Sequence, residues 1–130
     1  GISGIWEWRA NSSTDSSLSD IPSGLLVIGE TDGSGISVNS IVLEGASEIS
    51  TPENLVLFSS VDMEGSTTRK SQGDPEIEFS SSPDTRGVSI RSKAKLTDKG
   101  ARLVGYSEAA ITDQSGATKT LRYEWSANRR

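Results

Sequence analysis

The 130-residue chain contains neither cysteine nor histidine. Disulfide bonds are therefore excluded, and the fold has to be held together by packing alone. The same two absences exclude a Ser-His-Asp triad, a thiol nucleophile and a zinc site with its usual ligands. The chain also lacks any apolar run of about 18 residues, the length that predicts a membrane-spanning helix.

Hydrophobic residues are scarce, at 32% of the chain, whereas serine and threonine make up about a quarter of it. This composition indicates strands with many solvent-facing hydroxyl side chains, and it leaves open a polar face that binds sugar. The 13 basic and 18 acidic residues give a formal charge of −5. Because no basic patch is available to neutralise phosphate or attract anionic lipid, we expect neither a nucleic-acid partner nor an anionic-membrane partner. The missing apolar run predicts no membrane span.

No signal peptide is recognisable, and the first expected strand begins soon after Gly1. This abrupt start suggests that an upstream segment has been removed. A secreted chain without disulfides fits a bacterial envelope better than an animal secretion, although a cytosolic protein is equally free of disulfides. We therefore expect an extracytoplasmic bacterial protein, either periplasmic or associated with the envelope.

The stretch 87–127 reads as three antiparallel strands with two tight turns between them. In its first strand Ile90 and Ala94 alternate with Arg91 and Lys93, which puts apolar side chains on one face and charges in water. In the second strand both faces are mixed, so either face could point inward. The expected strands are 87–96, 102–112 and 118–127.

Shorter strands fill the earlier part of the chain, separated by turns rich in glycine, proline, serine and aspartate. A change of phase between Val38 and Ile41 indicates a β-bulge at Asn39 and Ser40. A turn over 64–66 ends the fourth strand. The strands expected here are 4–10, 24–31, 36–44, 54–64, 67–71 and 76–80.

No segment has the periodicity of a helix and no linker divides the chain, so we expect one domain over residues 1–130. Eight or nine consecutive short strands can close on themselves, which removes the sheet edges that would template aggregation. The expected fold class is therefore all-β, an up-and-down antiparallel β-barrel. A β-sandwich is the alternative.

The two ends of the chain carry matching aromatic residues, Trp6 and Trp8 near the start and Tyr123 and Trp125 near the end. If the first and last strands are neighbours, these side chains form an apolar cluster that plugs the barrel where the termini meet. The alternative is that one of the tryptophans lines a ligand cavity.

Residues 4–6, Gly-Ile-Trp, resemble the Gly-x-Trp signature of the lipocalins and related calycins. In that family the tryptophan packs across the closed end of an up-and-down barrel, and an arginine from the last strand lies over its indole. The resemblance implies that Arg129 or Arg130 makes a cation–π contact of about 1 kcal/mol. The residues implied in closing the barrel are Gly4, Trp6, Trp125 and Arg129.

Two features depart from that family. Thr97 and Asp98 are similar to the start of its Thr-Asp-Tyr motif, but Lys99 stands where the tyrosine would be. The helix that usually precedes the last strand is missing, and the chain is shorter than most lipocalins. The resemblance therefore implies an architecture and carries no particular ligand.

Carboxylates are the remaining candidates for catalysis, since two of them facing one cleft could act as acid and base. Spacing shows no such pair, because each glutamate falls on a strand face beside other polar residues. The turns 32–35 and 113–116 lack the carboxylate density of a calcium loop. We therefore expect no enzyme, no metal and no cofactor. The glutamates considered are Glu7, Glu76, Glu78, Glu108 and Glu124.

These observations favour a non-enzymatic binding protein with a small apolar ligand in the barrel interior. The alternative is a structural or protein-interaction module of the bacterial cell envelope with a filled core. An enzyme with two carboxylates in the barrel mouth is a third hypothesis. The oligomeric state and the identity of the ligand stay open. The residues predicted to line the ligand are Trp8, Leu25, Val27, Leu57, Phe58, Phe79, Val88 and Tyr123.

Overall fold

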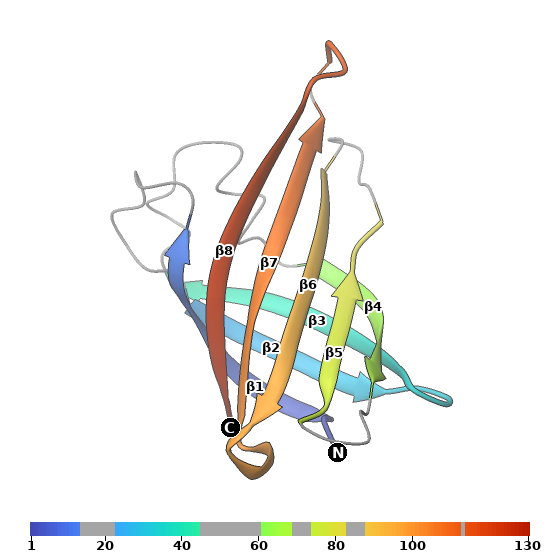
Figure 1. The fold of residues 1–130 in the computed structure, drawn as a ribbon, viewed down its shortest axis with the longest axis vertical. Coiled ribbons are helices and arrows are strands. Elements are labelled where there is room, and N and C mark those ends of the chain that lie inside the picture. The colour runs from blue at the N-terminus through green and yellow to red at the C-terminus, as the bar shows by residue number, and fades with distance from the viewer. Residues whose placement is uncertain (14–22, 45–60, 69–73, 83–87, 113) are drawn as a thin grey trace.

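The computed structural model describes residues 1–13, 23–44, 61–68, 74–82, 88–112 and 114–130. Its eight strands form one closed barrel in which each strand pairs antiparallel with the next (Figure 1). The predicted all-β up-and-down barrel is confirmed, and the alternative β-sandwich is wrong. The strands are β1 (Gly4–Ser13), β2 (Ser23–Glu30), β3 (Gly35–Glu44), β4 (Val61–Thr68), β5 (Glu76–Ser80), β6 (Val88–Thr97), β7 (Arg102–Thr112) and β8 (Thr118–Arg129).

The first and last strands lie side by side, as the aromatic residues at the two ends predict. Trp6 of β1 is opposite Arg129 of β8, and Ala10 is opposite Trp125. Because β8 pairs with both β7 and β1, the sheet closes on itself and leaves neither of these strands as an edge. Both termini lie at the same end of the barrel.

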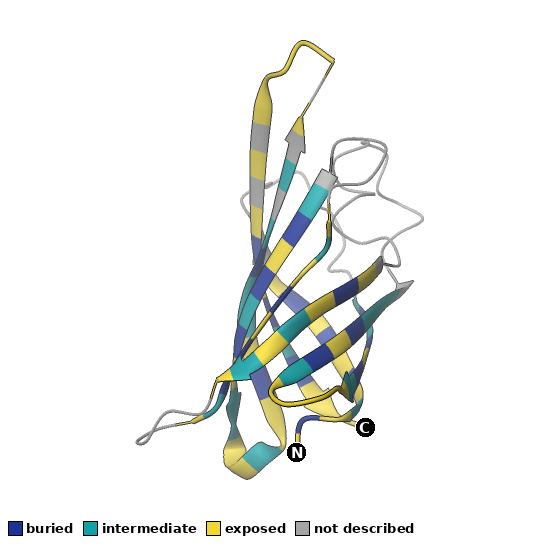
Figure 2. Ribbon diagram, turned by 90° about the vertical axis from the view of Figure 1, so that its right-hand side faces the viewer, coloured by how far each residue is buried: buried dark blue, intermediate teal, exposed yellow. Residues whose placement is uncertain are grey.

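Alternation along each strand decides which residues form the core. In β2, Leu26 and Ile28 are buried, whereas Val27 between them is 39% exposed. Figure 2 shows the same alternation of buried and exposed bands along the strands. The interior is therefore filled by every second side chain. The buried hydrophobic residues are Ile2, Trp6, Trp8, Ala10, Leu26, Ile28, Ile36, Val38, Met63, Ile77, Phe79, Ile90, Ala94, Leu103, Tyr123, Trp125 and Ala127.

β4 continues through Gly65, where the sequence predicts a turn. Gly65 is opposite Ile36 of β3 and Phe79 of β5, so it is paired on both sides. A Cβ atom here would overlap the backbone carbonyl of Glu78, and glycine therefore lets β4 and β5 approach closely. The predicted turn over 64–66 is wrong for this reason. Residues 54–60, predicted to begin this strand, lie outside the described residues.

β3 runs through Asn39 and Ser40 without the predicted bulge. Its pairing with β2 and with β4 is continuous at both residues. The register shifts instead near the end of β3, opposite Ser23 and Gly24 of β2. Ser40 therefore stays in phase with the buried Val38 and lies on the inner face.

The end of the barrel that holds both termini is closed by Trp6 and Arg129. The Trp6 side chain is fully buried, and its Nε1 donates to the carbonyl of Ile2 at 3.0 Å. The guanidinium carbon of Arg129 lies 4.3 Å from the centre of the Trp6 ring. Arg129 also donates to the carbonyls of Ser3 at 2.8 Å and Gly1 at 2.7 Å. The implied cation–π contact is thus present, and this is the closed end of the barrel.

Gly4 leaves room for the contact between Arg129 and Trp6. Gly4 has a φ of 139°, and a Cβ there would lie 3.3 Å from Nη1 of Arg129. Glycine is therefore suited to this position on both counts. Arg130, the other candidate for the contact, instead forms an ion pair with Glu7 at 3.2 Å.

A short helical turn, η1 (Asp98–Gly100), connects β6 to β7 where the sequence predicts a tight turn. Asp98 and Lys99 have positive φ angles of 52° and 56°. Nε of Arg129 donates to the carbonyl of Gly100 at 3.3 Å, so this turn is attached to the closed end. In the described part of the chain, no helix is long and apolar enough to cross a membrane.

Candidate ligand site in the barrel interior

A row of four side chains crosses the inner face of the barrel between the closed end and the opposite end. The described residues of β1, β3, β5 and β7 finish at this opposite end, which we name the open end. Phe79 of β5 is opposite Ser92 of β6, which is opposite Ser107 of β7. Ser107 is in turn opposite Tyr123 of β8. The two serines are buried, at 1% and 2% exposure. Two small side chains between two large rings leave a recess in the core.

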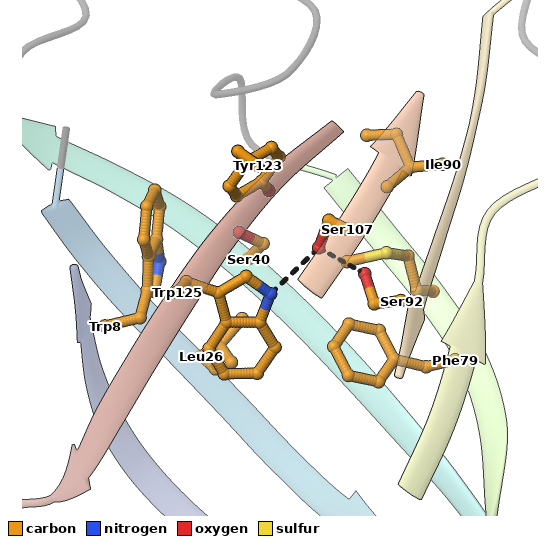
Figure 3. A pocket seen from close by; sticks show the side chains of 10 residues that line it. Trp8, Leu26, Ser40, Phe79, Ile90, Ser92, Ser107, Tyr123 and Trp125 are labelled. Atoms are coloured by element: carbon orange, nitrogen blue, oxygen red, sulfur yellow. Dashed lines mark hydrogen bonds between the residues drawn. The ribbon is translucent and has the colours of Figure 1, made fainter. Parts of the chain in front are cut away.

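The polar atoms of this row form a chain of hydrogen bonds. Nε1 of Trp125 donates to Oγ of Ser107 at 3.0 Å, and Oγ of Ser107 lies 2.6 Å from Oγ of Ser92 (Figure 3). A buried polar group without a partner costs about 1–3 kcal/mol. The chain removes that cost for the two serines and the indole together.

Tyr123 contributes a neutral hydroxyl to the site. Burial raises the pKa of its phenol above the ordinary value of 10.0, because the charged form is poorly solvated, and the neighbouring Ser107 hydroxyl opposes part of this rise. The phenol is therefore protonated at physiological pH. The site can donate and accept hydrogen bonds at this position but offers no charge there.

Apolar side chains complete the recess, which Figure 3 shows from close by. The rings of Phe79 and Trp125 are tilted by 52° with their centres 6.4 Å apart, a favourable geometry for an aromatic pair. None of the side chains around the recess carries a charge. The residues that line it are Trp8, Leu26, Ser40, Met63, Phe79, Ile90, Ser92, Ser107, Tyr123 and Trp125.

The recess is small. Its volume is about 20 Å³, which is room for roughly one water molecule. Pockets that enclose a drug-sized ligand are larger, at about 300–1,000 Å³. Without side-chain movement the recess therefore accepts only one small terminal group.

The structure brings together some of the residues predicted to line a ligand. Trp8, Phe79 and Tyr123 all line the recess. Leu25 and Val27 lie on the outer face of β2, and the prediction that they line the interior is wrong. The residues Leu57 and Phe58 and the side chain of Val88 lie outside the described residues.

The error in β2 has a simple cause. Residues 25–28 are an unbroken apolar run, so their sequence does not show which side chains alternate inward. The pairing of β2 with β1 settles the phase by placing Leu25 opposite the exposed Glu7 and Leu26 opposite the buried Trp6.

Trp125 does not lie at the closed end, where the sequence predicts it. It lies opposite Ala10, further from the closed end than Trp6, and its indole lines the recess. Trp6 and Trp125 belong to the same apolar core but serve different parts of it. The closure is made by Trp6, Gly4 and Arg129 without Trp125.

Sequence reasoning missed the serines of the site. Alternation places Ser92 on the apolar face of its strand with Ile90 and Ala94, but it was not predicted to contact a ligand. Ser107 has no comparable signal, because both faces of its strand are mixed. The bulge predicted at Asn39 and Ser40 prevented a prediction of the face on which the Ser40 side chain lies. The lining residues not predicted as ligand contacts are Leu26, Ser40, Met63, Ile90, Ser92, Ser107 and Trp125.

The five glutamates considered for catalysis do not converge on the recess. Glu108 pairs with Arg91 at 3.2 Å and with Arg122 at 3.3 Å on the outer face. Glu76 is buried at 8% exposure and lies 3.9 Å from the ammonium groups of Lys93 and Lys95, while Glu78 pairs with Lys93 at 3.4 Å. Glu124 is exposed on β8, and Glu7 pairs with Arg130. Within the part of the chain that the structure describes, no three acidic residues come close enough to hold a metal ion.

No protein-family model, no curated protein and no solved structure matches this chain. The closed eight-stranded antiparallel barrel is compatible with a lipocalin-like fold. The resemblance rests on residues 4–6 and on the contact between Arg129 and Trp6. Function therefore has to be argued from the site itself.

Proposed function

We propose that this chain is a non-enzymatic binding protein whose small, mostly apolar ligand enters from the open end and rests on the recess. The observation that carries this proposal is an aromatic hollow with buried hydroxyl groups along one wall. Sites for small molecules are typically concave and apolar, with a few polar groups that fix orientation. The recess combines these properties in one place.

The closed end determines the direction of access. Trp6 is fully buried there and Arg129 lies over its ring, so this end offers no path to the recess. The strands β1, β3, β5 and β7 finish at the other end. Along β8, Tyr123 comes before Trp125 on the way to the closed end. A ligand from the open end therefore meets the phenol before it reaches the indole.

The hydroxyl chain is more informative than the aromatic rings. Aromatic residues stabilise any core by the apolar area that they bury. Ser107 has a structural role, because it accepts a hydrogen bond from the buried Trp125 indole. Among the described residues, Ser92 bonds only to Ser107, and its replacement leaves no other described group unpaired. Its presence deep in a lean core favours a role in recognising a ligand.

The recess can be tested by filling it. Leu26→Phe adds volume inside the recess, whereas Leu25→Phe adds the same volume on the outer face of the same strand. We expect decane or 1-decanol to shift the tryptophan fluorescence of the parent protein in a saturable way. The Leu26 variant should lose this response and the Leu25 variant should keep it.

Folding has to be checked in parallel, because overpacking a core costs about 1–3 kcal/mol. Circular dichroism and urea unfolding of both variants provide this control. If neither probe binds the parent protein, or if the Leu26 variant binds as well as the Leu25 variant, binding in the interior is refuted.

A second candidate is a structural or interaction module of the bacterial cell envelope, outside the cytoplasm. Two observations favour it: the recess is small, and an apolar strip lies on the outer face of β1–β3. Ile5 is opposite Val27, and Leu25 is opposite Ile41. Ile5 and Val27 are 44% and 39% exposed. Contiguous exposed apolar surface commonly marks a contact site.

Sedimentation velocity tests this second candidate. Self-association that Val27→Glu abolishes would support it, with Ser37→Glu on the same outer surface as the control. Cell fractionation tests the envelope location. A protein that stays monomeric and binds the probes in its recess would contradict the interaction module.

A further inference from the structure

We propose that the recess selects a ligand that ends in a neutral hydroxyl group, such as a long-chain alcohol, over one that ends in a carboxylate or an amine. This inference rests on the proposed function and adds the chemical class of the ligand. It follows from the size of the recess, its lack of charge and the hydrogen-bonding capacity of Ser92.

Size limits the group that can enter. A volume of about 20 Å³ matches a single oxygen-centred group. A terminal hydroxyl fits it, while the alkyl chain extends toward the open end past Tyr123. The apolar side chains of Trp8, Leu26 and Ile90, which line the recess from different strands, suit the first methylene groups of that chain.

Charge excludes the common alternatives. No side chain that lines the recess is charged, and the Tyr123 phenol is kept neutral by burial. A carboxylate or ammonium group placed there would lose its hydration without gaining an opposite charge. Burying an unpaired charge is far more costly than burying a hydrogen-bonded hydroxyl. A fatty acid or a long-chain amine should therefore bind less tightly than the matching alcohol.

Hydrogen-bonding capacity points to a hydroxyl in particular. Among the described residues, the structure gives the Ser92 hydroxyl one hydrogen-bond partner, which is Ser107. Either oxygen of this pair could be the donor. If Ser92 donates, its oxygen can still accept, and if Ser107 donates, Ser92 can also donate to the ligand. A ligand hydroxyl can donate or accept, so it fits both states of the chain, whereas a carbonyl fits only one.

The position of Ser92 supports this assignment. Its oxygen is at the end of the chain that runs from Trp125 through Ser107. Ser92 also lies between Phe79 and Ser107 in the row across the sheet. A ligand hydroxyl bonded to Ser92 would extend this chain by one member without breaking the bonds already present.

The experiment compares four probes of equal chain length at neutral pH: decane, 1-decanol, decanoate and decylamine. Binding to the parent protein is followed by tryptophan fluorescence and confirmed by calorimetry. We expect 1-decanol to bind at least about tenfold more tightly than decanoate or decylamine. We also expect 1-decanol to bind more tightly than decane, because only the alcohol gains the bond to Ser92.

Ser92→Ala isolates that bond. It should weaken 1-decanol binding by about two- to tenfold, the range of one net hydrogen bond, and affect decane binding less, because decane makes no hydrogen bond to Ser92. Ser89→Ala removes a hydroxyl from the outer face of the same strand and should change neither affinity. The four-probe comparison on the parent protein needs no variant, so it decides the matter even if Ser92→Ala folds poorly.

The outcomes separate this inference from the function on which it rests. If decane binds but decanoate matches or exceeds 1-decanol, or if Ser92→Ala leaves 1-decanol affinity unchanged, the hydroxyl preference is overturned and interior binding stands. If none of the four probes binds, both are overturned.

Discussion

Removing the Arg129 side chain should destabilise the barrel by about 2–3 kcal/mol. The contact of its guanidinium with the Trp6 ring, at 4.3 Å, accounts for about 1 kcal/mol of this. Its donors also bond the carbonyls of Gly1, Ser3 and Gly100. Because these bonds are exposed, each contributes about 0.5 kcal/mol, the lower limit for a net hydrogen bond. Urea unfolding of Arg129→Ala, followed by tryptophan fluorescence, measures the loss.

Two further variants separate the parts of this effect. Arg129→Lys keeps a charge near Trp6 but cannot reproduce the three separate bonds, so it should recover about 1 kcal/mol. Arg130→Ala removes an exposed ion pair with Glu7 and should cost less than about 1 kcal/mol. If Arg129→Ala destabilises the protein no more than Arg130→Ala, the closed end does not depend on Arg129 and the reasoning is refuted.

Three other predictions follow from single contacts. Gly65→Ala should lower the free energy of unfolding in urea by about 1–3 kcal/mol, because its Cβ would overlap the Glu78 carbonyl. Gly29→Ala should lower it less, because the Cβ there meets only the Ser37 hydroxyl at 3.1 Å. Equal losses for the two variants would contradict this prediction. Backbone hydrogen bonds lower the pKa of Glu30 in the folded protein, so protonation of this carboxyl favours unfolding and stability should fall as the pH drops below 4.5. Glu30→Gln should show a smaller loss of stability over the same pH range. Burial raises the pKa of Tyr123, so stability should fall as pH rises above 10.0, and a Tyr123→Phe variant with the same fall would contradict this.

Much of the fold could be predicted from short-range patterns. Alternation over β6 and the turn at 98–100 identify two neighbouring strands correctly. Aromatic residues at both ends predict the pairing of β1 with β8, and the contact between Arg129 and Trp6 follows from the lipocalin resemblance. These features depend on residues close in sequence or at the two termini, where few alternatives compete.

The remaining features depend on register, which short patterns do not determine. An apolar run such as 25–28 is compatible with either inward phase, and only the pairing of Leu26 with Trp6 decides it. Gly65 predicts a turn locally, but its approach to Glu78 of the next strand keeps β4 continuous. The row of Phe79, Ser92, Ser107 and Tyr123 likewise exists only because three registers coincide.

The most direct test of the interior site is a crystal structure of the protein with 1-decanol. Our account predicts electron density for the alcohol with its oxygen within hydrogen-bonding distance of Ser92 Oγ and its chain directed toward the open end. Density confined to the outer strip at Ile5 and Val27, or an interior filled by side chains that exclude the alcohol, would contradict the account.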